Sequence, residues 1–283
     1  MNCINISIFF KNVNLEKNLK YIHAIARTIS DLGANILINK NYENYFIGFK
    51  IYFFEDIDEL MERSDILIVF GGDGTILKIA KLAAVFKKPI LGINGGKVGF
   101  ISTFEKSQVY KLRKLREGKY RVVNRTILET FFGEKSFLAI NDIVLNRSDN
   151  SQISNYEIYS ENRKICSYRS DGVIFSTPTG SSAYSLSAGG PIIKETMKCL
   201  CITPICAYSL FNKSVILDDE EIIVKYFLRK GSAINISIDG ELCFSNFNSG
   251  SLKIKIPKIN AKFITFDDVN CGSMDEKFIK NKI

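Results

Sequence analysis

The chain has 283 residues, of which 46% are hydrophobic and 24% charged, and its formal net charge at pH 7 is +8. This apolar content can fill the core of one large domain or of two smaller ones. The longest apolar stretches fall well short of the roughly 18 to 20 residues that span a bilayer, and no secretory leader is visible. We therefore expect a folded cytoplasmic protein without a membrane partner.

The cysteines, the histidine and the charges exclude further kinds of function. Seven scattered cysteines without a Cys-x-x-Cys pair argue against a disulfide framework and against a zinc knuckle. His23 is the only histidine and lies in a helical pattern, so a general base should be another kind of residue. Because the lysines are dispersed and no nucleic-acid-binding module is recognisable, we expect no nucleic-acid partner.

The first hundred residues alternate between strand-like and helix-like segments. Strands are predicted at residues 3–10, 34–38, 65–70 and 89–94, and helices at residues 15–32, 57–63 and 75–86. This alternation is typical of a parallel sheet with crossover helices. We therefore predict a Rossmann-like α/β domain over residues 1–103.

The rest of the chain is β-rich. After a charged helical segment at residues 106–117, short strands are predicted at residues 121–132, 137–146, 156–159, 172–176, 221–228, 233–238 and 251–256. They predict a β-sandwich-like domain over residues 104–261. A last strand at residues 262–266 opens a C-terminal segment that can pack back on the first domain, and the polar tail after Gly272 is expected to be mobile.

The most informative motif is Gly-Gly-Asp-Gly-Thr at residues 71–75, between the apolar strand 66–70 and a helix. Open α/β sheets bind ligands at the carboxyl ends of their strands. The glycines let a ligand approach the main chain, and the helix N-terminus offers unpaired N–H groups to phosphate. The motif predicts a nucleotide or phosphate site, the alternative being a tight turn capped by Asp73.

Two further segments are rich in small or polar residues. A second glycine cluster at residues 92–100 follows the next strand, where it either packs against the sheet or walls the same site, with Phe100 as a candidate stacking ring. Residues 171–191 gather hydroxyls and small residues behind a strand, as the recognition of a ribose or an adenine requires. A Ser/Thr capping loop explains only some of these hydroxyls.

A polar pair, Asn141 and Asp142, interrupts the apolar stretch 137–145. A bound ligand would satisfy these side chains, whereas the alternative is a polar turn or an edge bend.

In their order and spacing, these four segments resemble the NAD kinase family over roughly residues 65–242. Gly-Gly-Asp-Gly-Thr is shared with lipid kinases and, in related form, with phosphofructokinases, so it indicates phosphoryl transfer. The Pro-Thr-Gly-Ser-Ser-Ala-Tyr segment at residues 178–184 points to a dinucleotide acceptor. The resemblance implies transfer of a phosphoryl group from ATP, or from polyphosphate, to the 2′-hydroxyl of the adenosine ribose of NAD, with Mg²⁺ or another divalent cation accompanying ATP.

The resemblance also assigns roles to individual residues. Asp73 matches the catalytic carboxylate, which accepts the hydroxyl proton, helps to hold the metal, or does both. No metal site made of protein ligands alone is predicted. The positions matching the family's NAD contacts are Asp73, Gly74, Lys78, Phe100, Asn141, Asp142, Arg169, Asp171, Ser182, Ala183, Tyr184 and Ser187. Taken alone, Lys78, Arg169 and Asp171 would be ordinary surface charges.

The family comparison further implies a homodimer or homotetramer with shared sites. The chain departs from the family pattern at five positions: Asp142 stands where Glu is usual, Ser182 where Thr is commoner, Ala207-Tyr208 where many relatives have Pro-His, and Glu241 where Gln is common. A lipid kinase that shares the Asp73 motif and a non-catalytic dinucleotide sensor are the alternative functions.

Overall fold

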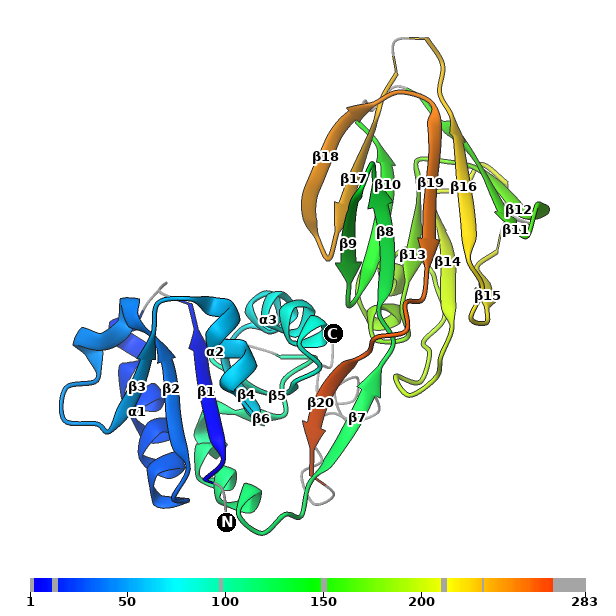
Figure 1. Cartoon of the computed structure of the whole chain (residues 1–283). Coiled ribbons are helices and arrows are strands. Elements are labelled where there is room, and N and C mark those ends of the chain that lie inside the picture. Colours follow the sequence, from blue (N-terminus) through cyan, green and yellow to red (C-terminus); the bar gives the residue numbers. More distant parts are fainter. Residues whose placement is uncertain are drawn as a thin grey trace. The chain divides into compact units, whose positions relative to one another are not determined.

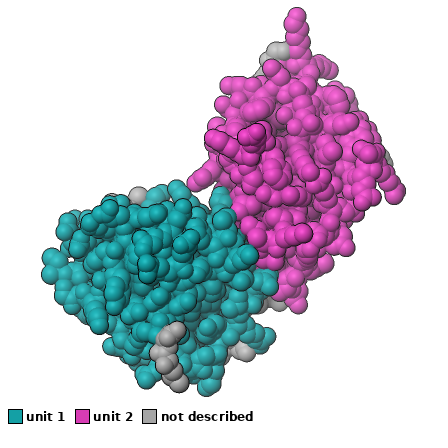
Figure 2. Space-filling view, viewed as in Figure 1, with its two compact units in different colours: residues 1–124, 261–283 teal, residues 125–260 magenta. Residues whose placement is uncertain are grey.

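The computed structural model describes residues 3–11, 15–96, 99–148, 152–209, 213–230 and 232–266 (Figure 1). Two residues of the second glycine cluster, Lys97 and Val98, and the tail after Gly272 lie outside these ranges. Contacts divide the chain into unit 1, residues 1–124 and 261–283, and unit 2, residues 125–260 (Figure 2). Among the described helices, none combines the length and the apolar composition that crossing a bilayer requires.

Unit 1 is built on one sheet in the strand order β3-β2-β1-β4-β5-β20-β7, with β6 paired to β5. Its strands are β1 (Asn5–Phe10), β2 (Asn35–Asn39), β3 (Ile51–Phe54), β4 (Ile66–Gly71), β5 (Pro89–Asn94), β6 (Phe104–Glu105), β7 (Arg121–Arg125) and β20 (Ala261–Thr265). From β3 through β1 and β5 to β20 every pairing is parallel. The predicted α/β domain is confirmed.

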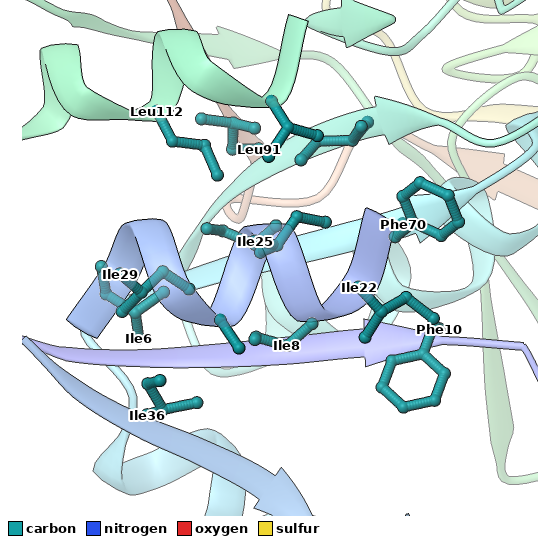
Figure 3. Packing of buried hydrophobic residues seen from close by; sticks show 14 of the residues in the cluster. Ile6, Ile8, Phe10, Ile22, Ile25, Ile29, Ile36, Phe70, Leu91 and Leu112 are labelled. Carbon is teal, nitrogen blue, oxygen red and sulfur yellow. The ribbon is translucent and has the colours of Figure 1, made fainter. Parts of the chain in front are cut away.

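The helical elements of unit 1 are α1 (Leu15–Asp31), η1 (Lys40–Tyr45), α2 (Ile57–Arg63), α3 (Asp73–Val85) and η2 (Lys106–Leu115), where η marks a 3-10 helix. Helix α1 buries one apolar stripe against β1 and η2, and Figure 3 shows Ile22, Ile25 and Ile29 facing the sheet. Each such isoleucine contributes roughly 1.5–3 kcal/mol when it is fully buried. The helix is followed by Gly33 at φ +74°, a conformation that glycine adopts without strain.

Helices α1 and α3 cover opposite faces of the sheet. Ile66, Ile68 and Phe70 of β4 pack in the core that contains α1. Successive residues of a strand point to opposite faces, and Gly92 of β5 lies against Ile76 of α3. The chain therefore leaves β1 toward one face and β4 toward the other, which makes the carboxyl ends of these neighbouring strands a topological switch point.

Unit 2 is a sandwich of two antiparallel sheets in the orders β15-β14-β13-β10-β17-β18 and β12-β11-β16-β19-β8-β9. The strands are β8 (Leu128–Phe132), β9 (Lys135–Ala139), β10 (Asp142–Arg147), β11 (Ser154–Ser160), β12 (Arg163–Ser170), β13 (Gly172–Ser176), β14 (Leu200–Ile205), β15 (Val215–Leu217), β16 (Ile222–Phe227), β17 (Ile234–Ile238), β18 (Glu241–Phe247) and β19 (Gly250–Lys255). Strand β16 alternates buried and exposed residues, because one of its faces meets the shared core. The predicted β-rich, sandwich-like fold is confirmed.

The structure subdivides two of the predicted strands. The segment 121–132 forms β7 and β8, which belong to different sheets, and the contacts divide the chain between residues 124 and 125 rather than at residue 103. The segment 137–146 forms β9 and β10, which are separated at Asn141. The charged helix is the 3-10 helix η2, and the short helical elements η3 (Gly180–Ser182) and α4 (Tyr184–Ser187) follow β13.

Candidate active site

The carboxylate of Asp73 lies at the carboxyl end of β4, at the start of α3. Gly72 is the N-cap of this helix and Asp73 is its first residue. Oδ2 of Asp73 accepts the backbone N–H of Phe100 at 3.0 Å, and Oδ1 accepts that of Ile101 at 3.3 Å. Because each carboxylate oxygen offers about two acceptor positions, these bonds orient the half-buried side chain and leave acceptor capacity for a ligand.

The second glycine turn is tied to the first. The N–H of Gly95 donates to the carbonyl of Gly71 at 3.0 Å. The buried side chain of Asn94 accepts the N–H of Gly96 at 2.8 Å and donates to both carboxylate oxygens of Glu105, at 3.2 and 3.0 Å. These bonds hold the turns after β4 and β5 side by side.

A cavity of about 200 Å³ opens at the switch point of unit 1. Its walls come from β1 and α1 on one side and from the two glycine turns on the other. The lining residues are Lys11, Asn18, Ile22, Phe70, Gly71, Gly72, Thr75, Gly95 and Gly96. A larger cavity of about 370 Å³ lies at the amino ends of the strands, where its walls include Ile4, Leu32 and Leu115. We place the candidate ligand site at the smaller one, since open α/β sheets bind ligands at the carboxyl ends.

Three other residues predicted to bind NAD also lie in unit 1. Gly74 is exposed in the first turn of α3, and Lys78 is exposed one turn later. The ring of Phe100 is 40% exposed, and the backbone of this residue binds Asp73. Phe100 is therefore brought together with Asp73 through its main chain, and its ring remains accessible for stacking on a base.

In unit 2, the corner between β9 and β10 presents Asn141 and Asp142. The loop that follows β13 docks on this corner: the N–H of Thr177 donates to the carbonyl of Asn141 at 2.9 Å, and Oγ1 of Thr177 donates to the carbonyl of Ile140 at 2.6 Å. The backbone of Gly180 approaches so closely that a Cβ there would lie 2.0 Å from the carbonyl oxygen of Asn141. Only glycine fits this contact.

The docked loop carries the hydroxyl-rich residues singled out in the sequence. Oγ of Ser182 donates to the carbonyl of Thr179 at 3.2 Å, and Ser185 hydrogen-bonds Thr203 of β14 at 2.9 Å. Ser182 and Ala183 are half-buried, and Tyr184 and Ser187 are exposed. Ser182, Ala183, Tyr184 and Ser187 are thus brought to the same end of the sheet as Asn141 and Asp142.

Three buried polar atoms at this end have no hydrogen-bond partner among the described residues. They are Oδ1 of Asn141, Oγ of Ser176 and Oγ1 of Thr179. Leaving such atoms unpaired costs about 1–3 kcal/mol each, so native proteins almost always pair them with protein, water or a ligand. The corner is therefore suited to a ligand that donates hydrogen bonds, such as a ribose hydroxyl or an adenine amino group.

A second carboxylate lies beside the corner. Asp239 begins the two-residue turn between β17 and β18, at φ +50°, and its carboxylate accepts the N–H groups of Ile140, Asn141 and Asp142 at 3.1, 2.7 and 3.2 Å. The three hydrogen bonds from these backbone N–H groups to the Asp239 carboxylate stabilise the corner. Burial, helped by the negative charge of Asp239, raises the pKa of the Asp142 carboxyl to about 7.

Arg169 and Asp171 are not brought to this corner. In β10, Asp142 is paired with Ser176 and Asn146 with Gly172, so Asp171 lies near the opposite end of this sheet. Arg169 precedes it by two residues in β12 of the other sheet, where it is paired with Asn155. Asp171 forms an ion pair with Arg147 at 3.0 Å, about 17 Å along β10 from Asp142 at roughly 3.4 Å per residue. The guanidinium of Arg169 stacks on the Tyr208 ring, with its carbon 5.0 Å from the ring centroid.

Sequence reasoning missed two residues of these sites. Lys11 follows β1 directly, but it is one of many dispersed lysines, and only the strand order places it beside the glycine turns. Asp239 carried a local signal, because Asp-Gly between two strand patterns predicts a tight hairpin. That signal predicts the turn and not the three bonds to residues 140–142.

A divalent cation would have Asp73 as its protein ligand in unit 1. Among the residues that the structure describes, no group of three or more His, Cys, Asp and Glu side chains could hold a metal ion. Magnesium in phosphotransferases commonly takes one or two carboxylates together with substrate phosphates. One carboxylate with spare acceptor capacity at the glycine turn fits a cation that arrives bound to a phosphate donor.

Sequence comparisons of this chain converge on one family. Residues 14–120 match the family model described as the ATP-NAD kinase N-terminal domain, and residues 140–266 match the one described as the ATP-NAD kinase C-terminal domain. A relative named NAD kinase, from Clostridium kluyveri, is 34% identical over 278 residues, which cover 95% of this chain and 95% of the relative.

Two solved structures share the fold. The crystal structure of yeast NADH kinase complexed with NADH matches with a TM-score of 0.85 and 22% identity, covering 100% of this chain and 89% of that chain. The crystal structure of an NAD kinase from Archaeoglobus fulgidus in complex with ATP matches with a TM-score of 0.71 and 21% identity, covering 98% and 97%. At these identities the likeness concerns the fold alone.

Proposed function

This chain belongs to the NAD kinase family, and we propose that it transfers a phosphoryl group from ATP to the 2′-hydroxyl of the adenosine ribose of NAD, forming NADP. The choice of NAD as the acceptor rests on one observation, the strand corner at Asn141 in unit 2. Its partnerless acceptor atoms and the docked hydroxyl loop suit a polar, rigid ligand with hydrogen-bond donors. A lipid acceptor would call for an apolar entrance instead.

The reaction needs an acceptor for one proton. The 2′-hydroxyl loses its proton to Asp73 as its oxygen bonds to the γ-phosphorus of ATP, and the bond from that phosphorus to the β–γ bridging oxygen breaks to release ADP. A divalent cation held by Asp73 and the donor phosphates would neutralise the charge on those phosphates. Fixed by two backbone N–H groups, Asp73 is oriented for either role.

The remaining NAD contacts extend the proposal. Gly74, Lys78 and Phe100 serve from unit 1, and Ser182, Ala183, Tyr184 and Ser187 serve from unit 2. Asp171 lies at the far end of β10 from Asn141 and Asp142, and Arg169 precedes it by two residues in β12. We propose that they act in the site of another copy of the chain, within a homodimer or homotetramer.

The donor and the compartment are further parts of the proposal. ATP with Mg²⁺ is the proposed donor, and polyphosphate is the other donor to be tested. The described cysteines are free thiols, as is usual in the reducing cytoplasm, which is the location we propose.

A competition between acceptors tests the function. The purified chain is incubated with γ-labelled ATP, Mg²⁺, NAD and diacylglycerol, and the labelled products are separated. We expect the label in NADP and none in lipid. Label in lipid alone would identify a lipid kinase, and binding of NAD without any labelled product would identify a dinucleotide sensor; either result refutes the proposal.

A further inference from the structure

The cavity at the switch point of unit 1 has a lysine at its rim. Phe10 of β1 is paired with Phe70 of β4, so Lys11 and Gly71 follow side by side where the two strands end. Lys11 is exposed and lines the cavity from the β1 side, together with Asn18 of α1. Gly71 and Gly72 line it from the β4 side, and Gly95 and Gly96 line it from the β5 side.

The polar groups of this lining suit an anion. Lys11 is the one charged side chain among the described lining residues. Asp73 is absent from the lining, and its carboxylate accepts the N–H groups of Phe100 and Ile101. The positive end of the α3 dipole and the backbone of the glycine turns add to the positive potential around the lysine.

Among the described residues, the space above the glycine turn is open. A Cβ added at Gly72 or at Gly74 would meet no atom of these residues within 4 Å, whereas one at Gly71 would press on Thr75 at 2.8 Å. A ligand can therefore approach the backbone at Gly72 without displacing a described side chain. An ammonium on one wall and accessible main chain on the other form a site for phosphate oxygens.

We propose that Lys11 binds the phosphate chain of the phosphoryl donor in the switch-point cavity. The inference rests on the proposed kinase function and deepens it, since it assigns the donor to the cavity in unit 1. The recognised chemistry is a chain of linked phosphates, which a nucleoside triphosphate and inorganic polyphosphate share. The lysine offsets charge on the phosphates during a transfer that depends on positioning and neutralisation more than on base strength.

Three variants separate this role from a structural one. Lys11→Met removes the charge and keeps the length of the side chain, and Lys11→Arg keeps the charge. Lys17→Met is the matched control, because Lys17 is an exposed lysine of α1 that does not line the cavity. Rates of NADP formation are measured with ATP varied at saturating NAD and then with NAD varied at saturating ATP. Calorimetry measures the binding of inorganic tripolyphosphate and of ATP.

We expect Lys11→Met to raise the KM for ATP at least tenfold and to weaken tripolyphosphate binding by a similar factor, as the loss of a charge-assisted hydrogen bond implies. The KM for NAD should stay within twofold. Lys11→Arg should retain most of the donor affinity, and Lys17→Met should match the wild type. If tripolyphosphate binding is too weak to measure, the affinity of Lys11→Met for ATP, compared with that of the wild type, tests the inference.

Two results would overturn the inference. One is a KM for ATP and a donor affinity within twofold of wild type in Lys11→Met. The other is an equal rise in both KM values, which would mark a general structural defect. A wild-type chain that binds tripolyphosphate through Lys11 but makes no NADP would refute the proposed function and leave the phosphate site standing.

Discussion

At the scale of single residues, Asp73, the proposed catalytic carboxylate, shows how the fold orients a side chain. Both of its carboxylate oxygens accept N–H groups from the loop that follows β5, so the side chain is positioned by the main chain of a different strand connection. A carboxylate fixed in this way needs little rearrangement when a hydroxyl acceptor and a donor arrive.

We predict that Asp73→Asn keeps NAD binding and loses turnover. The amide has nearly the same shape but cannot take up the acceptor proton, and general-base catalysis typically contributes 10²- to 10⁴-fold. We expect a kcat at least about 100-fold lower and an NAD dissociation constant within about threefold of wild type, measured by steady-state kinetics and calorimetry. Normal turnover in this variant would remove Asp73 from the mechanism.

Asp142 gives a prediction about pH. Its pKa is raised to about 7 in the folded chain from an ordinary value of 3.8. Between about pH 4 and pH 7 the folded chain therefore keeps a proton that the unfolded chain has released. Because of this difference, Asp142 lowers the free energy of unfolding as pH rises, and its destabilising effect is largest above pH 7. The cost can reach about 4 kcal/mol at high pH.

Asp142→Asn should therefore stabilise unit 2 increasingly from pH 5 to pH 8. Urea unfolding of the free chain at both pH values measures the gain, with Asp31→Asn, at an exposed carboxylate, as the control. A gain that is the same at both pH values would contradict the raised pKa.

At the scale of elements, the proposed acceptor site depends on how a loop docks on a strand corner. The η3 turn lies against Asn141 because residue 180 has no side chain. We predict that Gly180→Ala moves the loop off the corner, costs about 1–3 kcal/mol of unfolding free energy and weakens NAD binding. Gly72→Ala is the control for stability, since its Cβ would lie within 4 Å of no described residue, at an ordinary φ of −84°. Equal stability and NAD affinity in Gly180→Ala and wild type would contradict this account.

The elements also show what could be predicted from sequence. The β4 strand, the glycine turn and the following helix were predicted because a buried apolar run, glycines and a helical period stand next to one another. Strand β12 was missed, because its sequence Arg-Lys-Ile-Cys-Ser-Tyr-Arg-Ser has no regular alternation of apolar residues. The contacts of Asp239 and Lys11 join segments distant in sequence, and no local pattern encodes such pairings.

At the scale of the whole molecule, unit 1 is discontinuous in sequence. Strand β20 lies between β5 and β7 and brings Phe263, Ile264 and Phe266 into buried positions. Thr103 donates to the carbonyl of Ile264 at 2.9 Å. The segment that follows unit 2 therefore completes the sheet whose strand β4 leads to Asp73.

We predict that a chain ending at Asn260 loses the cooperative unfolding of unit 1 and keeps that of unit 2. Three buried apolar side chains at roughly 2 kcal/mol each are comparable with the whole stability of many domains, about 5–15 kcal/mol. Hydrogen exchange on the truncated chain measures protection in each unit, and a chain ending at Phe266 separates the effect of β20 from that of later residues. Undiminished protection in β1 and β4 after truncation at Asn260 would contradict the prediction.

The central claim is that the chain phosphorylates one hydroxyl of NAD, and the product's structure tests it most directly. Phosphorus NMR of the product from ATP, Mg²⁺ and NAD identifies the position of the new phosphate. We predict a single phosphomonoester at the 2′-oxygen of the adenosine ribose, formed by the wild type and nearly absent with Asp73→Asn. A phosphate on another hydroxyl, or no new phosphomonoester from the wild type, would contradict the account.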